Sequence, residues 1–321
     1  MNRKLPLVSI VTPAYNRSSF LEETIQSILG QDYPHIEFIV LDDGSTDNTR
    51  EVLQKYNGQI VWESHPNMGE TRTVNKGWRM ARGEIISVVN SDDPLLPGAV
   101  ATAVAFMQSH PDILVAYSDW ARIGPDSQVI EFVRVPEYDY LYMLRFHQCI
   151  VGPGAFIRRR AFALAGERDP DFRYVADFEY WLRLGLYGPF ARIPQTLATF
   201  RVHAESVSVY GTGTIMADEH IRMMQKFYSL PNLTLQVVEA RTEAFCWAHY
   251  VAASRCGPDR TAARKHYFKS LGYKPLSFFG KHGLKIIFFL LFLGPIFKML
   301  HRFWLRLLSA PDRDHTIQKV L

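Results

Sequence analysis

The sequence predicts an α/β protein whose central sheet is mainly parallel, with helices on both faces and a helical extension at the C-terminal end. Two observations support this fold class. Short β-branched apolar runs alternate with stretches of helical periodicity in the first part of the 321-residue chain. Each run ends in a polar turn, where strands of a doubly wound sheet present their ligand-binding edge. The composition, 47% hydrophobic and 21% charged, is that of a globular protein.

The first four strands are apolar runs rich in Val and Ile, and each is followed by a predicted helix. Turns that contain Ser, Asp or Pro-Gly mark the helix starts. The strands are expected at residues 7–12, 36–41, 59–63 and 84–89, and the helices at about 20–29, 46–53, 70–81 and 99–109. In the second half, strands are expected at 113–118, 129–135, 190–193 and 197–202, and helices at 176–184, 214–229 and 233–255.

Two acidic pairs lie at the ends of predicted strands. Asp42-Asp43 follows the second strand, and Asn90-Ser91-Asp92-Asp93 follows the fourth. Because parallel strands present their carboxyl ends at one edge, these carboxylates are expected close together, where they suit a divalent cation. For either pair alone, a polar turn that caps the next helix is the alternative. The chain has no Gly-x-Gly-x-x-Gly after its first strand and no Gly-Lys-Ser/Thr, which argues against dinucleotide-binding and P-loop proteins.

Five sequence blocks together resemble the family 2 glycosyltransferases, in the order and at the spacing of that family, over residues 7 to about 203. The blocks are Ser9-Ile-Val-Thr-Pro-Ala-Tyr-Asn16, Asp42-Asp-Gly-Ser-Thr-Asp47, Asn67-x-Gly69, Gly83-Glu84 and Asn90-Ser-Asp-Asp93. The resemblance implies a GT-A fold, which is Rossmann-like, and an inverting, metal-dependent hexosyltransferase that uses a nucleotide sugar. We therefore expect a catalytic domain at 1–210 and a helical extension at 211–275.

The resemblance also implies roles for individual residues. Asp177 is expected to be the catalytic base that takes the proton from an acceptor hydroxyl. Asp93, Asp92 and His203 are expected to hold Mg²⁺ or Mn²⁺, with Asp93 as the direct ligand. The nucleotide sugar is expected at Pro13, Ala14, Tyr15, Asn16, Asp43, Arg72, Asn90, Ser91, Asp92 and Gly154.

Two positions depart from the family pattern. Asn90 stands where the metal motif begins with Asp, and Ala176 stands where a Glu precedes the catalytic Asp. These departures keep open a non-catalytic sugar-nucleotide-binding or scaffold protein, and paired carboxylates beyond a parallel sheet also fit a nucleotidyltransferase. Singly, Asp177 also fits a helix cap, and His203 a hydrogen-bonded loop residue. The run Arg158-Arg159-Arg160 is interpreted as a solvated helix start, with phosphate or acceptor contact as the alternative.

The C-terminal part is basic. Residues 257–321 hold twelve Lys/Arg and three Asp/Glu, a net charge of +9, whereas residues 1–256 carry −5. The apolar run 286–297 is too short to span a bilayer, and with its basic flanks it predicts membrane-associating amphipathic helices at 276–321, with residues 281–308 on the lipid surface. A core or dimer helix is the alternative. Embedded aromatic residues argue against nucleic acid.

Three cysteines without Cys-x-x-Cys spacing suit a reducing compartment, and the N-terminus has no apolar export signal. We therefore expect a cytoplasmic protein, peripheral on the inner face of the cytoplasmic membrane. The expected reaction moves a sugar from a nucleotide-diphosphate sugar, foremost a UDP-sugar, to a hydroxyl of a glycan or lipid-linked acceptor in cell-surface polysaccharide biosynthesis. The sequence does not identify the sugar, the linkage or the oligomeric state.

Overall fold

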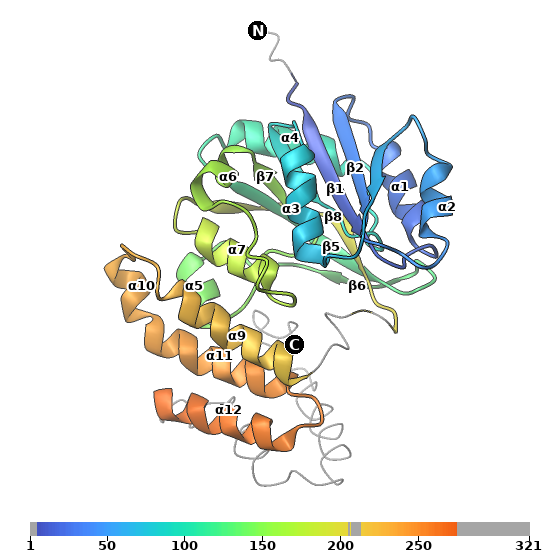
Figure 1. Cartoon of the computed structure of the whole chain (residues 1–321). Coiled ribbons are helices and arrows are strands. Elements are labelled where there is room, and N and C mark those ends of the chain that lie inside the picture. Colours follow the sequence, from blue (N-terminus) through green and yellow to red (C-terminus); the bar gives the residue numbers. More distant parts are fainter. Residues whose placement is uncertain (1–4, 205, 207–212, 275–321) are drawn as a thin grey trace.

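The computed structural model describes residues 5–204, 206 and 213–274, which form an eight-stranded sheet flanked by helices and a separate group of helices beside it (Figure 1). The strand order is β3-β2-β1-β4-β7-β5-β6, and β8 pairs with β5. The strands are β1 (Val8–Ala14), β2 (Ile36–Asp42), β3 (Val61–Ser64), β4 (Ile85–Val88), β5 (Val115–Ile123), β6 (Val129–Val133), β7 (Phe156–Arg158) and β8 (Phe190–Arg201).

The sheet has a parallel half and a mixed half. Strands β3, β2, β1 and β4 are all parallel, as the alternation of strands and helices predicts. Beyond β4, the short strand β7 runs antiparallel to both β4 and β5, whereas β8 runs parallel to β5. The carboxyl ends of β1, β2 and β4 therefore share one edge, and the turns after them meet there.

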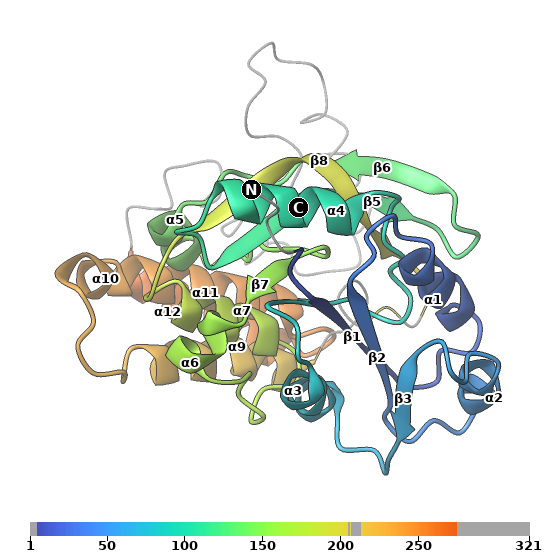
Figure 2. The same ribbon diagram turned by 90° about the horizontal axis from the view of Figure 1, so that it is seen from above.

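Helices cover both faces of the sheet, as predicted. On one face, Ile10 of β1 packs in a core with α1 (Leu21–Leu29), α2 (Thr49–Gln54) and α4 (Ala99–Ser109). On the other face, Val11 of β1 packs in a core with α3 (Glu70–Met80) and α7 (Ala176–Leu184). Successive side chains of a strand point to opposite faces, so one apolar strand supplies both cores. Figure 2 shows α3 and α4 on opposite sides of the sheet.

The helices after β8 join the second of these cores. Ala217 and Met224 of α9 (Thr214–Phe227) and Ala244 and Ala248 of α11 (Arg241–Arg255) are fully buried and belong to the same cluster as α7. The predicted helix at 233–255 is interrupted at Ala240 and forms two helices, α10 (Leu235–Glu239) and α11. They are followed by α12 (Arg260–Tyr273). The predicted membrane-associating helices at 276–321 lie outside the described residues.

One prediction about the second half is wrong, and the solvated helix start predicted for residues 158–160 holds only for Arg159 and Arg160, which are exposed. The strands expected at 190–193 and 197–202 are one strand, β8, because it stays paired with β5 through an irregularity at Ser118 to Trp120. Arg158 is the last residue of β7, and α6 begins only at Arg160 (Arg160–Ala165). The three arginines from 158 to 160 donate hydrogen bonds to backbone carbonyl oxygens of other segments. The three arginines therefore hold neighbouring segments of the chain together. A further short helix, α5 (Tyr140–Arg145), was not predicted from the sequence.

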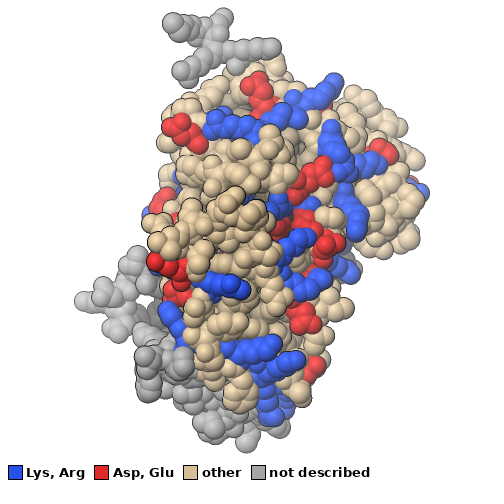
Figure 3. All heavy atoms as spheres, turned by 60° about the vertical axis from the view of Figure 1, so that its left-hand side comes forward, with Lys and Arg blue, Asp and Glu red and all other residues tan. Residues whose placement is uncertain are grey.

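Basic and acidic side chains are interleaved over the middle of the face shown in Figure 3. Several such side chains in the described part of the chain form ion pairs, for example Arg79 with Glu167 at 2.6 Å. Within the described ranges, no helix has the length and apolar character needed to cross a membrane.

Candidate active site

The turn after β4 carries the predicted metal motif, and its second carboxylate is buried. One oxygen of Asp93 accepts the backbone N–H of Arg201 at 2.7 Å, and the other accepts the amide of Asn90 at 2.9 Å. Burial, and next the neighbouring charge of Asp92, raise the pKa of Asp93 above its ordinary value. Ser91 is also buried, and its carbonyl oxygen accepts the hydroxyl of Thr24. Asp93 therefore braces the turn, and its direct contact with a metal stays a prediction.

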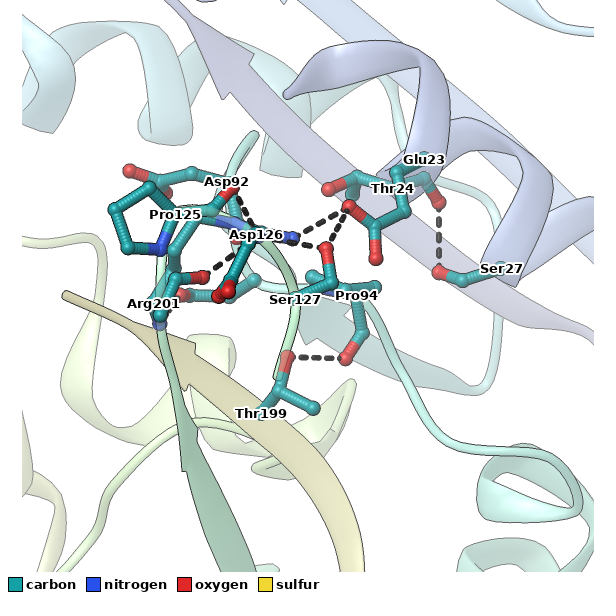
Figure 4. A network of polar contacts seen from close by, with 12 residues as sticks. Glu23, Thr24, Ser27, Asp92, Pro94, Pro125, Asp126, Ser127, Thr199 and Arg201 are labelled. Carbon is teal, nitrogen blue, oxygen red and sulfur yellow. Dashed lines mark hydrogen bonds and ion pairs between the residues drawn. The ribbon is translucent and has the colours of Figure 1, made fainter. Parts of the chain in front are cut away.

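The side chain of Arg201, at the end of β8, holds this turn against two other segments (Figure 4). It is fully buried and donates to the Asp92 carbonyl oxygen at 2.9 Å, to the Gly124 carbonyl oxygen at 3.0 Å and to the Glu23 carboxylate at 2.6 Å. The rigid guanidinium fork suits several acceptors at once. Arg201 thereby fixes the position of Asp92 and Asp93 relative to α1 and to the β5–β6 turn.

Asp92 and His203 lie together, as predicted. The Nε2 atom of His203 is 2.9 Å from an oxygen of Asp92, and the guanidinium of Arg17 lies 3.4 Å from the same oxygen. The side chains of Asp92 and His203 are 16% and 6% exposed, so both are enclosed but Asp92 still reaches the surface of the site. No sequence pattern indicated a role for Arg17, although it directly follows Tyr15-Asn16 in the loop after β1.

The residues present fit a divalent cation. Two adjacent ligands of an octahedral ion with bonds of about 2.0–2.1 Å lie roughly 3 Å apart, close to the separation of the Asp92 and His203 donor atoms. Carboxylate oxygen and imidazole nitrogen both bind first-row divalent metals. No group of three or more His, Cys, Asp or Glu side chains placed to hold a metal is found in the described part of the chain. A cation here therefore needs further ligands from substrate or water.

A cavity of about 390 Å³ brings together Asn90 and Asp177, which are far apart in the sequence. Asp177 lies in the first turn of α7 with an exposed side chain, and one of its oxygens accepts the Phe178 N–H at 2.7 Å. Ala176, the position where the family pattern has Glu, is also in the wall. The cavity therefore joins the predicted base to the predicted metal turn, and the roles of both stay predictions.

Aromatic and charged side chains that the sequence analysis did not select complete this cavity. Trp120 of β5 and Trp181 of α7 form part of the wall, and the indole of Trp120 packs against Gly152 so closely that an added Cβ at Gly152 would lie 2.9 Å from its ring nitrogen. Glu70 and Arg168 lie in the same wall. An apolar wall with a few polar groups is typical of small-molecule sites, and aromatic rings suit the C–H faces of a sugar. No local sequence pattern distinguishes these residues from core or surface positions.

The loop after β1 lies at the predicted edge. Pro13 and Ala14 are the last residues of β1, with buried side chains, whereas Tyr15 is 46% exposed. Asn16 has a positive φ of 53°, and its side-chain oxygen accepts the Thr46 N–H at 2.8 Å. These contacts join the loops after β1 and β2 into one wall. The assignment of these residues to nucleotide binding stays a prediction.

Three other predicted binding residues are placed differently from Asn90. Asp43 is buried, and its carboxylate accepts the N–H groups of Met68 and Gly69 at 2.7 and 3.0 Å. Arg72 lines a neighbouring cavity of about 620 Å³. Gly154 has a φ of +77°, and a Cβ there would lie 2.7 Å from the Ala198 Cβ, so this glycine is required for backbone packing. Within the described residues, none of the three lines the cavity of Asp177.

Comparison with known proteins agrees with this architecture. The sequence profile of Glycosyl transferase family 2 matches residues 9–163. WfaP of Escherichia coli, a UDP-Glc:alpha-D-GlcNAc-diphosphoundecaprenol beta-1,3-glucosyltransferase, is 30% identical over 210 residues, covering 64% of this chain and 80% of WfaP. The putative teichuronic acid biosynthesis glycosyltransferase TuaG of Bacillus subtilis is 31% identical over 138 residues, covering 41% of this chain and 54% of TuaG.

The fold is shared with solved structures. The mannosyltransferase PcManGT from Pyrobaculum calidifontis, solved with GDP-Man and Mn²⁺, superimposes with a TM-score of 0.59 at 17% identity, covering 95% of this chain and 86% of that one. The chain spans 59%, 54% and 65% of the length of three of its curated relatives, so it corresponds to part of them. The sheet with its flanking helices is the predicted GT-A fold. The match of this chain to the family profile, and its 30% identity to WfaP over 80% of the WfaP length, show that the chain belongs to glycosyl transferase family 2.

Proposed function

We propose that this chain is an inverting glycosyltransferase that moves a sugar from a UDP-sugar to a hydroxyl group of a glycan or lipid-linked acceptor in the synthesis of a cell-surface polysaccharide. The observation that carries the proposal is one cavity that is lined by both Asp177 and Asn90, the first residue of the predicted metal turn. A nucleotide sugar held at the turn brings its anomeric carbon toward the carboxylate that receives the acceptor proton.

In the proposed reaction the acceptor oxygen attacks the anomeric carbon from the face opposite the diphosphate. The new C–O bond forms as the bond to the phosphate oxygen breaks, the nucleoside diphosphate leaves with the electron pair, and the acceptor proton passes to the free oxygen of Asp177. One displacement inverts the anomeric configuration. The walls of Trp120 and Trp181 hold the sugar and limit water at the reacting carbon.

Asp92 and His203 would hold a divalent cation, Mg²⁺ or Mn²⁺, and Asp93 would keep Asp92 in place. A cation bound there supplies charge neutralisation to the leaving diphosphate. Arg17, whose guanidinium lies 3.4 Å from Asp92, would add a second positive charge beside the leaving diphosphate. Asp43 and the loop of Pro13 to Asn16 would take the nucleoside. The bond of Asp43 to the backbone at 68–69 supports an indirect role, in which it shapes the loop that the base contacts.

The activities for which two relatives are named support the proposed substrate classes. WfaP uses UDP-Glc and a diphosphoundecaprenol-linked sugar, and TuaG is named for teichuronic acid biosynthesis. PcManGT was solved with GDP-Man and Mn²⁺, so the same fold also accepts a guanine nucleotide. We propose a site of action on the inner face of the cytoplasmic membrane, on the basic, amphipathic sequence of residues 281–308.

Donor binding is the first test. UDP-, GDP-, dTDP- and CMP-sugars are compared by thermal shift, with and without Mn²⁺, on the wild type and on Asp92→Asn. A ligand at 100 times its Kd stabilises by about 2.7 kcal/mol, which gives a measurable shift in Tm. We expect a Mn²⁺-dependent shift with a UDP-sugar that is lost in the variant. A protein that responds to none of the nucleotide sugars is better described as a non-catalytic scaffold protein.

Asp177→Asn tests the base. The variant keeps an oxygen that can accept the Phe178 N–H, and the side chain is exposed, so the fold and donor affinity should be unchanged. Transfer to acceptors in native membranes should fall about 10²- to 10⁴-fold. Asp171→Asn is the matched control, because Asp171 is an exposed carboxylate on the preceding loop that does not line the cavity. Near-normal transfer by Asp177→Asn refutes the assignment.

A further inference from the structure

A second cavity, of about 620 Å³, opens beside the active-site cavity and is lined by α3, the segment 167–170, α7 and α9. We call it the outer groove. Arg168 lines both the outer groove and the active-site cavity, so the two are joined at this side chain. The proposed reaction uses nothing in the outer groove.

The outer groove has a surplus of positive charge. Its lining contains five basic and three acidic side chains. Three of the basic groups are neutralised: Arg79 by Glu167 at 2.6 Å, Arg183 by Glu179 at 2.5 Å, and Lys226 by Asp169. The two that remain are Arg72 and Arg168. Among the described residues, Arg72 has no carboxylate partner, and Arg168 has only Glu70, at 4.0 Å.

Arg168 is built into its position. The Asn75 side chain of α3 holds its backbone on both sides: the Asn75 amide donates to the Arg168 carbonyl oxygen at 2.7 Å, and the Arg168 N–H donates to the Asn75 oxygen at 3.1 Å. The guanidinium lies over the Trp78 ring, 5.5 Å from its centroid. The loop cannot move Arg168 without breaking these contacts, so its guanidinium is pre-positioned.

The guanidinium of Arg168 is buried without its full set of acceptors. Its side chain is only 9% exposed, and its Nε–H has no hydrogen-bond partner anywhere in the described part of the chain. Buried polar groups in folded proteins are nearly always hydrogen-bonded, and a charged one without an acceptor is unfavourable. A buried arginine at the junction of two cavities therefore points to an acceptor that a ligand supplies.

We propose that Arg168 and Arg72 form a phosphate-binding subsite for the acceptor. The acceptor then carries a phosphate or diphosphate group that lies in the outer groove, while its reacting hydroxyl lies at Asp177 in the adjoining cavity. Arg72, without a carboxylate partner, and Arg168, with only Glu70 at 4.0 Å, match the double negative charge of a phosphate better than the single charge of a carboxylate, and the guanidinium fork matches phosphate geometry. The inference rests on the proposed function, because it gives the substrate class of the same site.

The leaving diphosphate of the donor belongs elsewhere. Asp92, His203 and Arg17, which would surround it, line neither cavity, whereas Arg168 lines both. The phosphate at Arg168 is therefore a second anion that is present together with the donor. Simultaneous occupation by nucleotide and phosphate distinguishes an acceptor subsite from an alternative position of the donor.

The test uses the full-length protein saturated with UDP and Mg²⁺, with inorganic phosphate as the probe. Phosphate binding is followed by ³¹P NMR line broadening at low ionic strength, where electrostatic contacts are least screened. The wild type should bind UDP and phosphate together. Arg168→Met should weaken phosphate binding about 10- to 100-fold, as expected for the loss of a charged hydrogen bond. Arg72→Met, on an exposed position, should weaken it several-fold.

Arg79→Met is the matched control, because Arg79 lines the same groove but its charge is neutralised by Glu167. It should leave phosphate binding within about twofold of the wild type, since a paired, exposed charge contributes little. Arg168→Lys covers the case in which Arg168→Met fails to fold. It keeps the charge, loses the fork, and should still bind phosphate more weakly than the wild type.

Each outcome decides the proposal. Phosphate binding that is unchanged in both Arg72→Met and the folded Arg168 variant overturns it, and so does phosphate that competes with UDP. Acetate that binds as tightly as phosphate overturns the phosphate assignment in favour of a carboxylate acceptor. Failure of the wild type to bind UDP refutes the proposed function instead, and this is read in the same spectra from the UDP phosphorus signals.

Discussion

Replacing Arg201 with lysine tests whether the end of β8 positions the metal turn. Lysine keeps the positive charge but presents one ammonium group in place of a rigid fork. It cannot reach the carbonyl oxygens of Asp92 and Gly124 and the carboxylate of Glu23 together, since these acceptors belong to three separate segments. Arg201→Lys should therefore loosen the turn without placing an opposite charge in the site.

The loss of stability follows from those acceptors. The Glu23 side chain is 44% exposed, so water replaces its partner and that ion pair adds little. The carbonyl oxygens of Asp92 and Gly124 lose a buried donor, at roughly 1–3 kcal/mol each. We expect the free energy of unfolding to fall by about 2–6 kcal/mol in the Lys variant. At roughly 2–4 °C per kcal/mol for a large domain, this shift in Tm is easily measured.

The assay combines urea unfolding with titration of Mn²⁺ and a UDP-sugar, and Arg192→Lys is the control. Arg192 also lies in β8, is 3% exposed and pairs with Asp119 through both carboxylate oxygens, but it does not contact the metal turn. Both variants should lose stability, and only Arg201→Lys should also bind Mn²⁺ and donor at least tenfold more weakly. Equal donor affinity in the two variants at a temperature where both are folded would refute the positioning role.

Three further predictions concern single residues. His203→Ala should raise the Mn²⁺ concentration needed for half-maximal transfer by at least about tenfold, since even the loss of a partner outside the metal's direct ligands costs this much. It should also lower Tm, because the imidazole is buried and packs against Phe20. An unchanged Mn²⁺ requirement would exclude His203 as a ligand. Burial, and next the neighbouring His266, lower the pKa of His249 to about 4, so the unfolded chain binds this proton from near pH 6.5 and the folded chain only near pH 4. Stability should thus be complete above pH 6.5 and fall by roughly 3 kcal/mol toward pH 4, and His249→Gln should flatten this part of the unfolding curve against pH. Gly154→Ala should destabilise the protein more than Gly166→Ala does. Both glycines have a positive φ, which costs an alanine about 1–2 kcal/mol at either position. Only at Gly154 does the added Cβ also lie within 3 Å of other atoms. Equal Tm losses would show that the contact relaxes freely.

The parallel half of the fold was predictable because its signals are local. Each of β1, β2 and β4 is a short apolar run with a polar turn behind it, and the position of such turns at one edge follows from parallel pairing alone. The turns that carry the two acidic pairs therefore lie at the same edge of the sheet, as the sequence indicates. The observed boundaries of α4 (Ala99–Ser109) agree with the predicted ones because this signal is also local: Pro97-Gly98 marks the start of the helix.

The second half depends on pairing that no local pattern reveals. His203 approaches Asp92 only because β8 lies parallel to β5 through the irregularity at 118–120, which carries the strand onward to Arg201. Arg168 has the sequence context of a surface arginine between two acidic residues, yet it is buried because Asn75 of α3 clamps its backbone. Contacts between segments so far apart in the chain are set by the tertiary fold, so sequence patterns miss Arg17 and Arg168.

Asn90 illustrates how the structure changes the meaning of a departure from a family pattern. From sequence, an amide in place of a carboxylate favours a decayed site. In the structure, the Asn90 amide donates to Asp93, whose carboxylate is buried beside Asp92 and already lies in a region of negative charge. An aspartate at position 90 would replace that donor with a third carboxylate and repel Asp93. A neutral residue that donates a hydrogen bond is therefore the one that keeps Asp93 in place and Asp92 available to His203, so the substitution is consistent with a retained metal site.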